Sequence, residues 1–184
     1  MAESVVPDRI FLTRGLGRHR EKLASFELAL RDAGIAPFNL VKISSIFPPH
    51  CRLISREEGL PLLKHGQILH LVMSEHATDE AHRWIAAAIG VARSNTPEHY
   101  GYLAEYHSHG QAEQEAGHHA EDLAAFMLAT ILGQDFDLRE IWEEEKSVYR
   151  ISDSLTITTQ NMTQAAQGAA GVWTTALAAA VCIL

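Results

Sequence analysis

The most apolar stretch of the chain is its end, residues 169–184, and this stretch limits the folds that the chain can adopt. It is too short to cross a bilayer as a helix, which takes about 20 residues, and it contains Thr174 and Thr175. It is also rich in alanine and glycine, which let neighbouring backbones approach closely. We therefore expect a close-packed core strand here, and neither a membrane helix nor a membrane partner.

The rest of the chain is a mixture of strand-like segments and a few helix-like segments. Gly15 and Gly17 are expected to end the first strand. The predicted strands lie at residues 9–13, 39–43, 67–74, 100–106 and 155–159, and the predicted helices at 19–34 and 111–132. Residues 84–91 stay open, because their alanines suit a helix whereas their Ile, Ala and Val also suit a strand buried on both faces. The mixture indicates an α+β protein.

Spacings of three and four residues predict which side of each helix faces the core. On the first helix the predicted core-facing stripe is Leu23, Phe26, Leu30 and Ala33. On the second helix it includes Leu123, Phe126, Met127 and Ile131.

Composition and charge narrow the possible functions. A chain of 184 residues, 47% of them hydrophobic and without repeat or linker, is predicted to form one domain spanning residues 1–184. The formal net charge of −8, with scattered Lys and Arg, provides no basic surface for nucleic acid. Cys51 and Cys182 lack metal or redox spacing, and the N-terminus has no apolar signal segment. We expect a cytoplasmic protein.

A pair of serines marks the place where the predicted strand at 39–43 ends. Residues 39–49 read Asn-Leu-Val-Lys-Ile-Ser-Ser-Ile-Phe-Pro-Pro, and the two prolines make the end of this run rigid. If the backbone is strained and the carbonyl of Ser44 is polarised, the hydroxyl of Ser45 can attack it and convert the amide to an ester. Elimination gives dehydroalanine, which hydrolyses to a pyruvoyl group and ammonia. The same residues also suit an ordinary strand-to-turn transition, and local chemistry leaves both interpretations open.

This run of residues is similar to the processing site of the pyruvoyl-dependent arginine decarboxylase family. Further matching segments lie at residues 26–30, 33–35, 104–106 and 171–173. The segment at 104–106 is Ala-Glu-Tyr in a strand context, and the one at 171–173 is Gly-Val-Trp before an alanine-rich strand. The resemblance covers nearly the whole chain from Arg9 and is loose in the middle and over residues 135–167.

The resemblance implies a fold, an assembly and an activity. The fold is a four-layer αββα sandwich, assembled as a trimer with active sites between subunits, and residues 84–91 become a strand. Self-cleavage between Ser44 and Ser45 gives a β chain, residues 1–44, and an α chain, residues 45–184, with the pyruvoyl group formed from Ser45. The implied reaction is decarboxylation of arginine to agmatine and CO2, with the pyruvoyl carbonyl withdrawing the electron pair that CO2 leaves behind.

Glu105 is the implied general acid. The α-carbon of the substrate must be protonated after CO2 leaves, which suits a carboxylic acid whose pKa is raised in a dry pocket. Glu105 occupies the family's position for this role, with Leu103 and Tyr106 beside it and few competing charges. Apart from the resemblance, a glutamate on an alternating strand is typical of a solvent-facing position.

Glu27, Asn39 and Ser44 are the implied substrate-binding residues. Glu27 lies four residues after Leu23 and three before Leu30, so it is expected along the apolar stripe, where a carboxylate needs a partner. Archaeal family members have Asp at this position facing the substrate guanidinium, and Glu keeps the charge with one more methylene. Asn39 and Ser44 match positions near the pyruvoyl group. From the residues alone, Asn39 also suits a turn and Ser44 only the leaving side of the cut.

Other interpretations remain open beside this one. The chain has 11 histidines, and His107 and His109, followed by a histidine pair at 118–119, suggest a metal-dependent hydrolase. The run resembles the JAMM metalloproteases, but Gly117 and Ala120 stand where those enzymes need Ser and Asp. Decarboxylation of another amino acid and an unprocessed, non-catalytic relative are two further alternatives. A role in polyamine synthesis or in acid resistance is equally open.

Overall fold

The computed structural model describes residues 5–133, 142–143, 148–152 and 154–184. The elements in chain order are β1 (Arg9–His19), α1 (Lys22–Asp32), β2 (Asn39–Lys42), β3 (Ile46–Phe47), β4 (Arg52–Ile54), α2 (Arg56–Gly59), the 3₁₀ helix η1 (Leu60–Leu62), β5 (Ile68–Thr78), β6 (Trp84–Ser94), β7 (Gly101–His109), α3 (Glu113–Ile131), β8 (Trp142–Glu143), β9 (Val148–Arg150), β10 (Thr156–Gln167) and β11 (Trp173–Ile183). Among the described residues, no helix combines the length and the apolar character that a membrane span requires.

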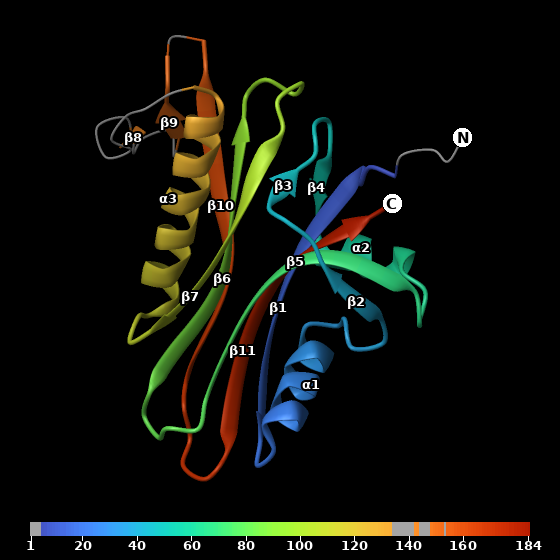
Figure 1. The fold of residues 1–184 in the computed structure, drawn as a ribbon, viewed down its shortest axis with the longest axis vertical. Helices are drawn as coiled ribbons and strands as arrows, with labels where there is room; N and C mark the ends of the chain where they lie inside the picture. Colours follow the sequence, from blue (N-terminus) through green and yellow to red (C-terminus); the bar gives the residue numbers. More distant parts are fainter. Residues whose placement is uncertain (1–4, 134–141, 144–147, 153) are drawn as a thin grey trace.

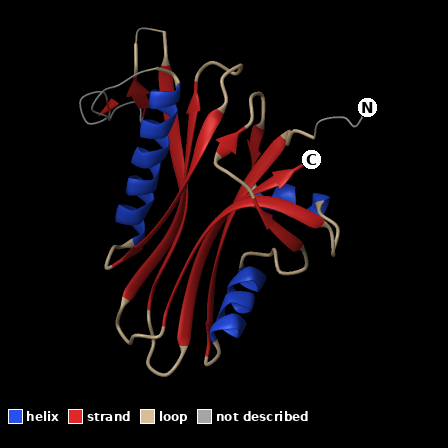
Figure 2. Cartoon of the chain, viewed as in Figure 1, coloured by secondary structure: helices blue, strands red, loops and turns tan. Residues whose placement is uncertain are grey.

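Two sheets pack face to face, and a helix covers the outer face of each (Figure 1). The five-stranded sheet has the order β2-β5-β11-β1-β4, and the six-stranded sheet has the order β3-β7-β6-β10-β9-β8. Helix α1 packs on β1 and β11, and α3 packs on β6, β7 and β10. The separate positions of the two long helices, with strands filling the space between them, are clear in Figure 2. The layers therefore follow the expected αββα order.

The C-terminal strand β11 lies in the middle of the five-stranded sheet. It pairs antiparallel with β1 along its whole length and with β5 on its other side. Residues 174–183 are all buried, which confirms the predicted core strand. Strand β6 occupies the segment that the alanines left ambiguous, and its interior position confirms the choice of a strand there.

Glycines inside β1 let α1 approach the sheet closely, and this corrects two predictions. Gly15 and Gly17 do not end the strand but lie within it. A Cβ on Gly17 would lie 1.9 Å from the carbonyl oxygen of Ser25, and one on Gly15 would lie 2.0 Å from that of Ala29. The helix contacts the sheet through these small residues, because bulky side chains do not fit between the two backbones. Leu23 is 79% exposed, so its place in the predicted stripe is wrong.

The same packing sets the orientation of α3. A Cβ on Gly90 of β6 would lie 1.9 Å from the carbonyl oxygen of Ala120, so the helix backbone rests almost on the strand. The side of α3 that faces the sheet is formed mainly by alanines, with Leu128. Phe126, Met127 and Ile131 are between 37% and 43% exposed, so the prediction that they face the core is wrong. Of that predicted set, Leu123 does pack against the core.

Short edge strands leave part of one side of the sandwich without a covering strand. β2 pairs with β5 only at residues 68–71, and β3 pairs with β7 only at residues 101–102. Beyond these pairs, β5 and β7 meet across the sandwich, where Oγ of Ser74 donates to the carbonyl oxygen of Tyr106 at 2.6 Å. We call this side, formed by residues 72–78 and 103–109, the β5–β7 seam.

Candidate functional site

Ser44 and Ser45 lie where the chain passes from one sheet to the other. β2 belongs to the five-stranded sheet and β3 to the six-stranded sheet, and only residues 43–45 separate them. Before the serines, the N–H of Ile43 donates to a β5 carbonyl at 2.9 Å. After them, the N–H of Leu103 in β7 donates to the carbonyl oxygen of Ser45 at 2.7 Å. The backbone of this crossing is therefore fixed by hydrogen bonds to both sheets.

The carbonyl of Ser44, which the Ser45 hydroxyl would attack, is polarised in the structure. Its oxygen accepts a hydrogen bond from the N–H of Ile46 at 3.1 Å. A backbone N–H aimed at a carbonyl oxygen stabilises the negative charge that develops there during nucleophilic attack. Ser44 is exposed and Ser45 is half-buried. The crossing thus provides an electrophile, an adjacent hydroxyl and an oxyanion donor, which are the parts that an N-to-O acyl shift requires.

The two serines show neither a cis peptide bond nor a positive φ, which are two common forms of backbone strain. The peptide between Ser44 and Ser45 is trans. Among the described non-glycine residues, those with positive φ are His50, five residues after Ser45, and His82, so neither serine has a positive φ. Polarisation of the carbonyl is therefore what the structure supplies.

Glu105 lies on β7, two residues beyond the strand's contact with the crossing. Because side chains alternate along a strand, it points to the same side as Leu103, which is fully buried between the sheets. Partial burial raises the pKa of the Glu105 carboxyl above its ordinary value, although the residue remains exposed in the single chain. The positive charges of Lys42 and His107 act in the opposite direction. A carboxyl that retains its proton more readily than usual suits a general acid.

Asn39 lies at the start of β2, at the other end of this strand from the serines. Its side-chain Nδ2 donates to the carbonyl oxygen of Gly66 at 2.7 Å, which holds the start of β2 beside the turn that precedes β5. Within one chain, the structure does not bring Asn39 to the crossing. Its role in substrate binding stays a prediction.

Glu27 lies on α1, in the outer layer of the sandwich. Its Oε1 accepts a hydrogen bond from Nε of Arg31 at 3.0 Å, and both side chains are accessible to solvent. Glu105 faces the space between the sheets, so the five-stranded sheet separates the two carboxylates within one chain. The structure therefore unites Ser44, Ser45 and Glu105 and leaves Glu27 apart from them.

The histidines that suggest a metal site lie on different sides of the six-stranded sheet. His107 and His109 face the five-stranded sheet, where their rings contact His76. His119 lies on α3 and packs on the ring of Tyr106 with centroids 4.4 Å apart. Within the parts of the chain that the structure describes, no group of three or more His, Cys, Asp or Glu could hold a metal ion. The hydrolase interpretation therefore finds no site there.

A cavity of about 720 Å³ lies on the opposite side of the sandwich, lined by residues of β1, β4 and β10. Its polar lining includes Arg14, Asp32, Gln160 and Gln164. Neither serine nor Glu105 lines this cavity. Ser44 is exposed in the single chain, so a second surface would have to cover the crossing before a substrate could be enclosed.

Known proteins resemble this chain over almost its full length. The sequence model of the pyruvoyl-dependent arginine decarboxylase family matches residues 9–184. A probable pyruvoyl-dependent arginine decarboxylase of Chlorobium limicola is 51% identical over 178 residues, covering 97% of this chain and 98% of the relative. A pyruvoyl-dependent arginine decarboxylase of Nitrosopumilus maritimus is 50% identical over 181 residues, covering 98% of each chain. Pyruvoyl-dependent arginine decarboxylase 2 of Methanosarcina mazei is 51% identical over 178 residues, covering 96% of this chain and 97% of the relative.

The αββα sandwich, the serine crossing and these matches together define a pyruvoyl-dependent decarboxylase. More particularly, the chain belongs to the pyruvoyl-dependent arginine decarboxylase family. Membership implies a covalently bound pyruvoyl group. The crossing fits this group, because a polarised carbonyl precedes the half-buried Ser45 from which it would form.

Parts of this site were not predicted from the sequence. The N–H groups of Ile46 and Leu103 belong to the backbone, and no pattern of side chains indicates where a backbone donor points. Lys42 lies inside the recognised motif and His107 just beyond another, but their effect on Glu105 depends on how β2 and β7 come together. The antiparallel pairing of β3 with β7 was the missing information.

The pKa of Glu105 can be measured by carbon-detected NMR titration of the carboxyl group, and we expect it above the ordinary value of 4.5. Lys42→Met should raise this pKa further, because the lysine charge favours the ionised form, whereas Lys64→Met serves as a surface control. If the pKa of Glu105 is higher in the folded state than in the unfolded state, the folded protein binds this proton more tightly. The resulting contribution to the free energy of unfolding is complete below the unfolded-state pKa, and it is lost as the pH rises through the folded-state pKa. A measured pKa at or below 4.5 contradicts the expectation.

Proposed function

We propose that this chain cuts itself between Ser44 and Ser45, converts Ser45 into a pyruvoyl group, and decarboxylates arginine to agmatine and CO2. The observation that carries the proposal is the hydrogen bond from the N–H of Ile46 to the carbonyl of Ser44, in a crossing anchored on both sheets. The names of the relatives supply the substrate, since they are arginine decarboxylases.

Processing begins at the hydroxyl of Ser45. Its Oγ attacks the carbonyl carbon of Ser44, the peptide C–N bond breaks, and the freed nitrogen takes up the hydroxyl proton, which leaves an ester. Loss of the Ser45 α-proton then breaks the Cβ–Oγ bond, so that Ser44 departs as a carboxylate and dehydroalanine remains. Water converts dehydroalanine into the pyruvoyl group and releases ammonia. The Ile46 N–H would stabilise the oxyanion of the first step.

The two pieces would remain one folded unit after the cut. Residues 1–44 contain β1 and β2, and residues 45–184 contain their partners β11 and β5. β1 is paired with β11 over its whole length and with β4 on its other side, so the cut removes none of these pairings. We therefore propose one domain over residues 1–184, composed of a β chain and an α chain.

Glu105 is proposed to deliver the proton that replaces CO2. The pyruvoyl group, once formed, supplies an electron sink for the α-carbon, in the role that pyridoxal phosphate has in other decarboxylases. Glu105 lies next to the crossing on the strand that binds Ser45, and partial burial favours its protonated form. Exclusion of water by bound substrate would favour that form further.

We propose that Glu27 of a neighbouring copy binds the substrate guanidinium, in a trimer whose subunits complete one another's sites. Three observations support this arrangement. Ser44 and Glu105 are exposed in the single chain, Glu27 is on the outer layer, and the five-stranded sheet separates it from Glu105. Glu27 already accepts a hydrogen bond from the guanidinium of Arg31, which substrate arginine would replace. Asn39, also exposed, is proposed to contribute from the same interface together with Ser44.

Denaturing electrophoresis and intact mass measurement test the processing step. Purified protein should separate into pieces of 44 and 140 residues, since 184 − 44 = 140. Ser45→Ala should stay whole because it lacks the attacking hydroxyl. Ser44→Ala should still be cut because the carbonyl and the Ser45 hydroxyl remain. A wild-type chain that stays uncut on prolonged incubation, and that has no carbonyl reactive toward hydrazine, would refute the mechanism.

Glu105→Gln separates processing from turnover. The variant should be cut normally, because the cut uses Ser45 and the Ser44 carbonyl, but it should decarboxylate arginine at least ~10²-fold more slowly because it lacks the general acid. Agmatine release measures turnover, and electrophoresis measures processing. Glu98→Gln, at an exposed glutamate in the loop before β7, is the control. Turnover of Glu105→Gln within a few-fold of wild type would assign the acid to another group.

Glu27→Gln tests recognition of the substrate's cationic end. Loss of a charge-assisted contact with the guanidinium should cost about 1.5–3 kcal/mol, seen as a higher KM for arginine with processing unchanged. Glu21→Gln, just before α1, should leave KM unchanged. If Glu27→Gln and wild type have equal kinetics with arginine, Glu27 does not bind the guanidinium. If the wild-type enzyme prefers lysine to arginine, the proposed substrate is wrong.

A further inference from the structure

Three histidines from both sheets meet at the end of the β5–β7 seam farthest from the serine crossing. His76 of β5 stacks on His107 of β7, with ring centroids 5.0 Å apart. Nε2 of His76 also lies 3.0 Å from Nε2 of His109, again on β7. β5 and β7 belong to different sheets, so these contacts join the two sheets at this end.

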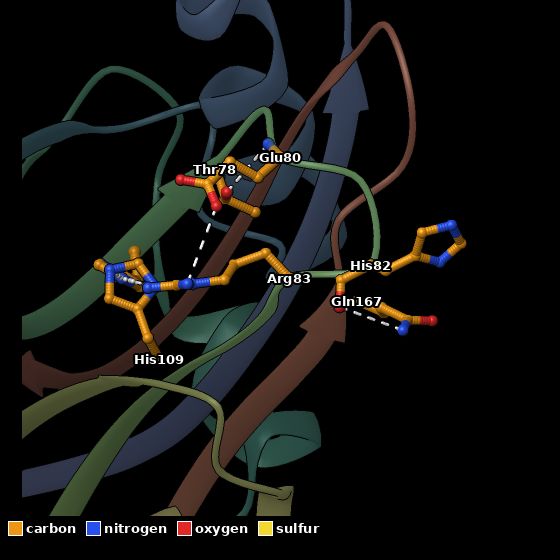
Figure 3. Close-up of polar contacts among 7 residues, drawn as sticks. Thr78, Glu80, His82, Arg83, His109 and Gln167 are labelled. Atoms are coloured by element: carbon orange, nitrogen blue, oxygen red, sulfur yellow. Dashed lines mark hydrogen bonds and ion pairs between the residues drawn. The ribbon is translucent and has the colours of Figure 1, made fainter.

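The hydrogen bond from Arg83 determines where His109 carries its proton. Nε of Arg83 donates to Nδ1 of His109 at 3.3 Å, and the approach of the guanidinium to the ring is visible in Figure 3. A guanidinium only donates, so Nδ1 of His109 is unprotonated and the neutral ring carries its hydrogen on Nε2. Nε2 of His76 lies 3.0 Å from that nitrogen and 3.3 Å from Nδ1 of His109, so the two rings and the guanidinium form one close group. The hydrogen bond from Arg83 therefore requires the His109 ring to be neutral.

Protonation of either ring disrupts this series. A second proton on His109 would place an N–H against the Arg83 donor, and a charged His76 would lie against the Arg83–His109 pair and the His107 ring. Each added proton also brings a positive charge next to others in a partly buried place. The contacts that join the sheets here are therefore favoured by neutral rings and weakened by protonation.

The charged and titratable groups around His76 are mostly cationic. They are His107 and His109 on β7, Arg83 and Glu80 in the β5–β6 loop, and Lys22 at the start of α1. Glu80 is the carboxylate of this group, and it is already shared with Arg83 at 3.8 Å. His82, in the same loop, points away from His109 (Figure 3). Burial, followed by the charges of His109, His107, Arg83 and Lys22, lowers the pKa of His76 to about 4.

We propose that His76, His107 and His109 form a pH-sensitive latch, which holds the two sheets together at neutral pH and releases them in acid. We call these three residues the histidine latch. Release separates the last residues of β5 from those of β7, while the bond from Ser74 to Tyr106 marks where the sheets stay joined. The latch acts on the conformation of the sandwich, whether or not the chain decarboxylates arginine.

The direction of the pH dependence follows from proton linkage. His76 has a lower pKa in the closed latch, about 4, than its ordinary value of 6.5, so the open latch binds more protons. The closed form is fully favoured above 6.5 and loses its advantage as the pH falls toward 4. For His76 alone, these two values correspond to an approximately 30-fold fall in the closing equilibrium between pH 7.5 and pH 5.0.

Hydrogen exchange of the full-length assembled protein tests the latch. After correction for intrinsic exchange rates, protection of residues 75–78 and 107–110 should fall about 30-fold between pH 7.5 and pH 5.0. Protection of paired residues in the middle of β1 and β11 should not show this fall. His76→Gln, which keeps an amide but does not titrate, should flatten the change at the seam. His118→Gln, at an exposed position on α3, should behave as wild type.

NMR titration of the imidazole signals in the wild-type protein gives an answer that needs no variant. His76 should remain neutral well below pH 6.5. A His76 that titrates at its ordinary value, seam protection that does not change with pH, or a His76→Gln variant with the wild-type pH dependence would each overturn the proposal.

Discussion

The crossing of the chain between the two sheets is the constraint on which the candidate site depends. Hydrogen bonds from Ile43 to β5 and from Leu103 to Ser45 hold the three residues between β2 and β3 on both sides. A free loop would sample many geometries and would rarely direct the Ile46 N–H at the Ser44 carbonyl. Because each end of the crossing belongs to a different sheet, the packing of the whole sandwich fixes the geometry at one peptide bond.

The sandwich itself depends on close contact between helix and sheet backbones. Gly15, Gly17 and Gly90 stand where any Cβ would collide with a helix carbonyl. Small residues such as Ser25 and Ala29 therefore face the sheet, and larger apolar residues are displaced to the sides of the helices or into solvent. This displacement leaves Glu27 on the outer side of α1, accessible to a ligand or to another copy of the chain.

The same strand links the two chemically distinct regions of the seam. Along β7, Leu103 binds the serine crossing, Glu105 follows it on the same face, and His107 and His109 continue the row. Conditions that loosen the histidine end would therefore act on the strand that carries the candidate acid. A row of titratable groups on one strand couples the proton chemistry of the site to the packing of the two sheets.

The sequence by itself determined the family, through the run at 39–49, and with it the fold class, Ser45 and the identity of the candidate acid Glu105. It also predicted the core strand at the C-terminus, because this apolar stretch is too short for a membrane helix and its small residues let neighbouring strands pack closely. Only the tertiary structure decided which helix faces are buried, since Leu23 and Phe126 follow the apolar spacing but backbone contact at glycines favours alanine and serine. It also decided that the Ile46 N–H polarises the Ser44 carbonyl and that His76 meets His109, because hydrogen bonds and contacts between different sheets depend on register and packing, which a linear pattern does not encode.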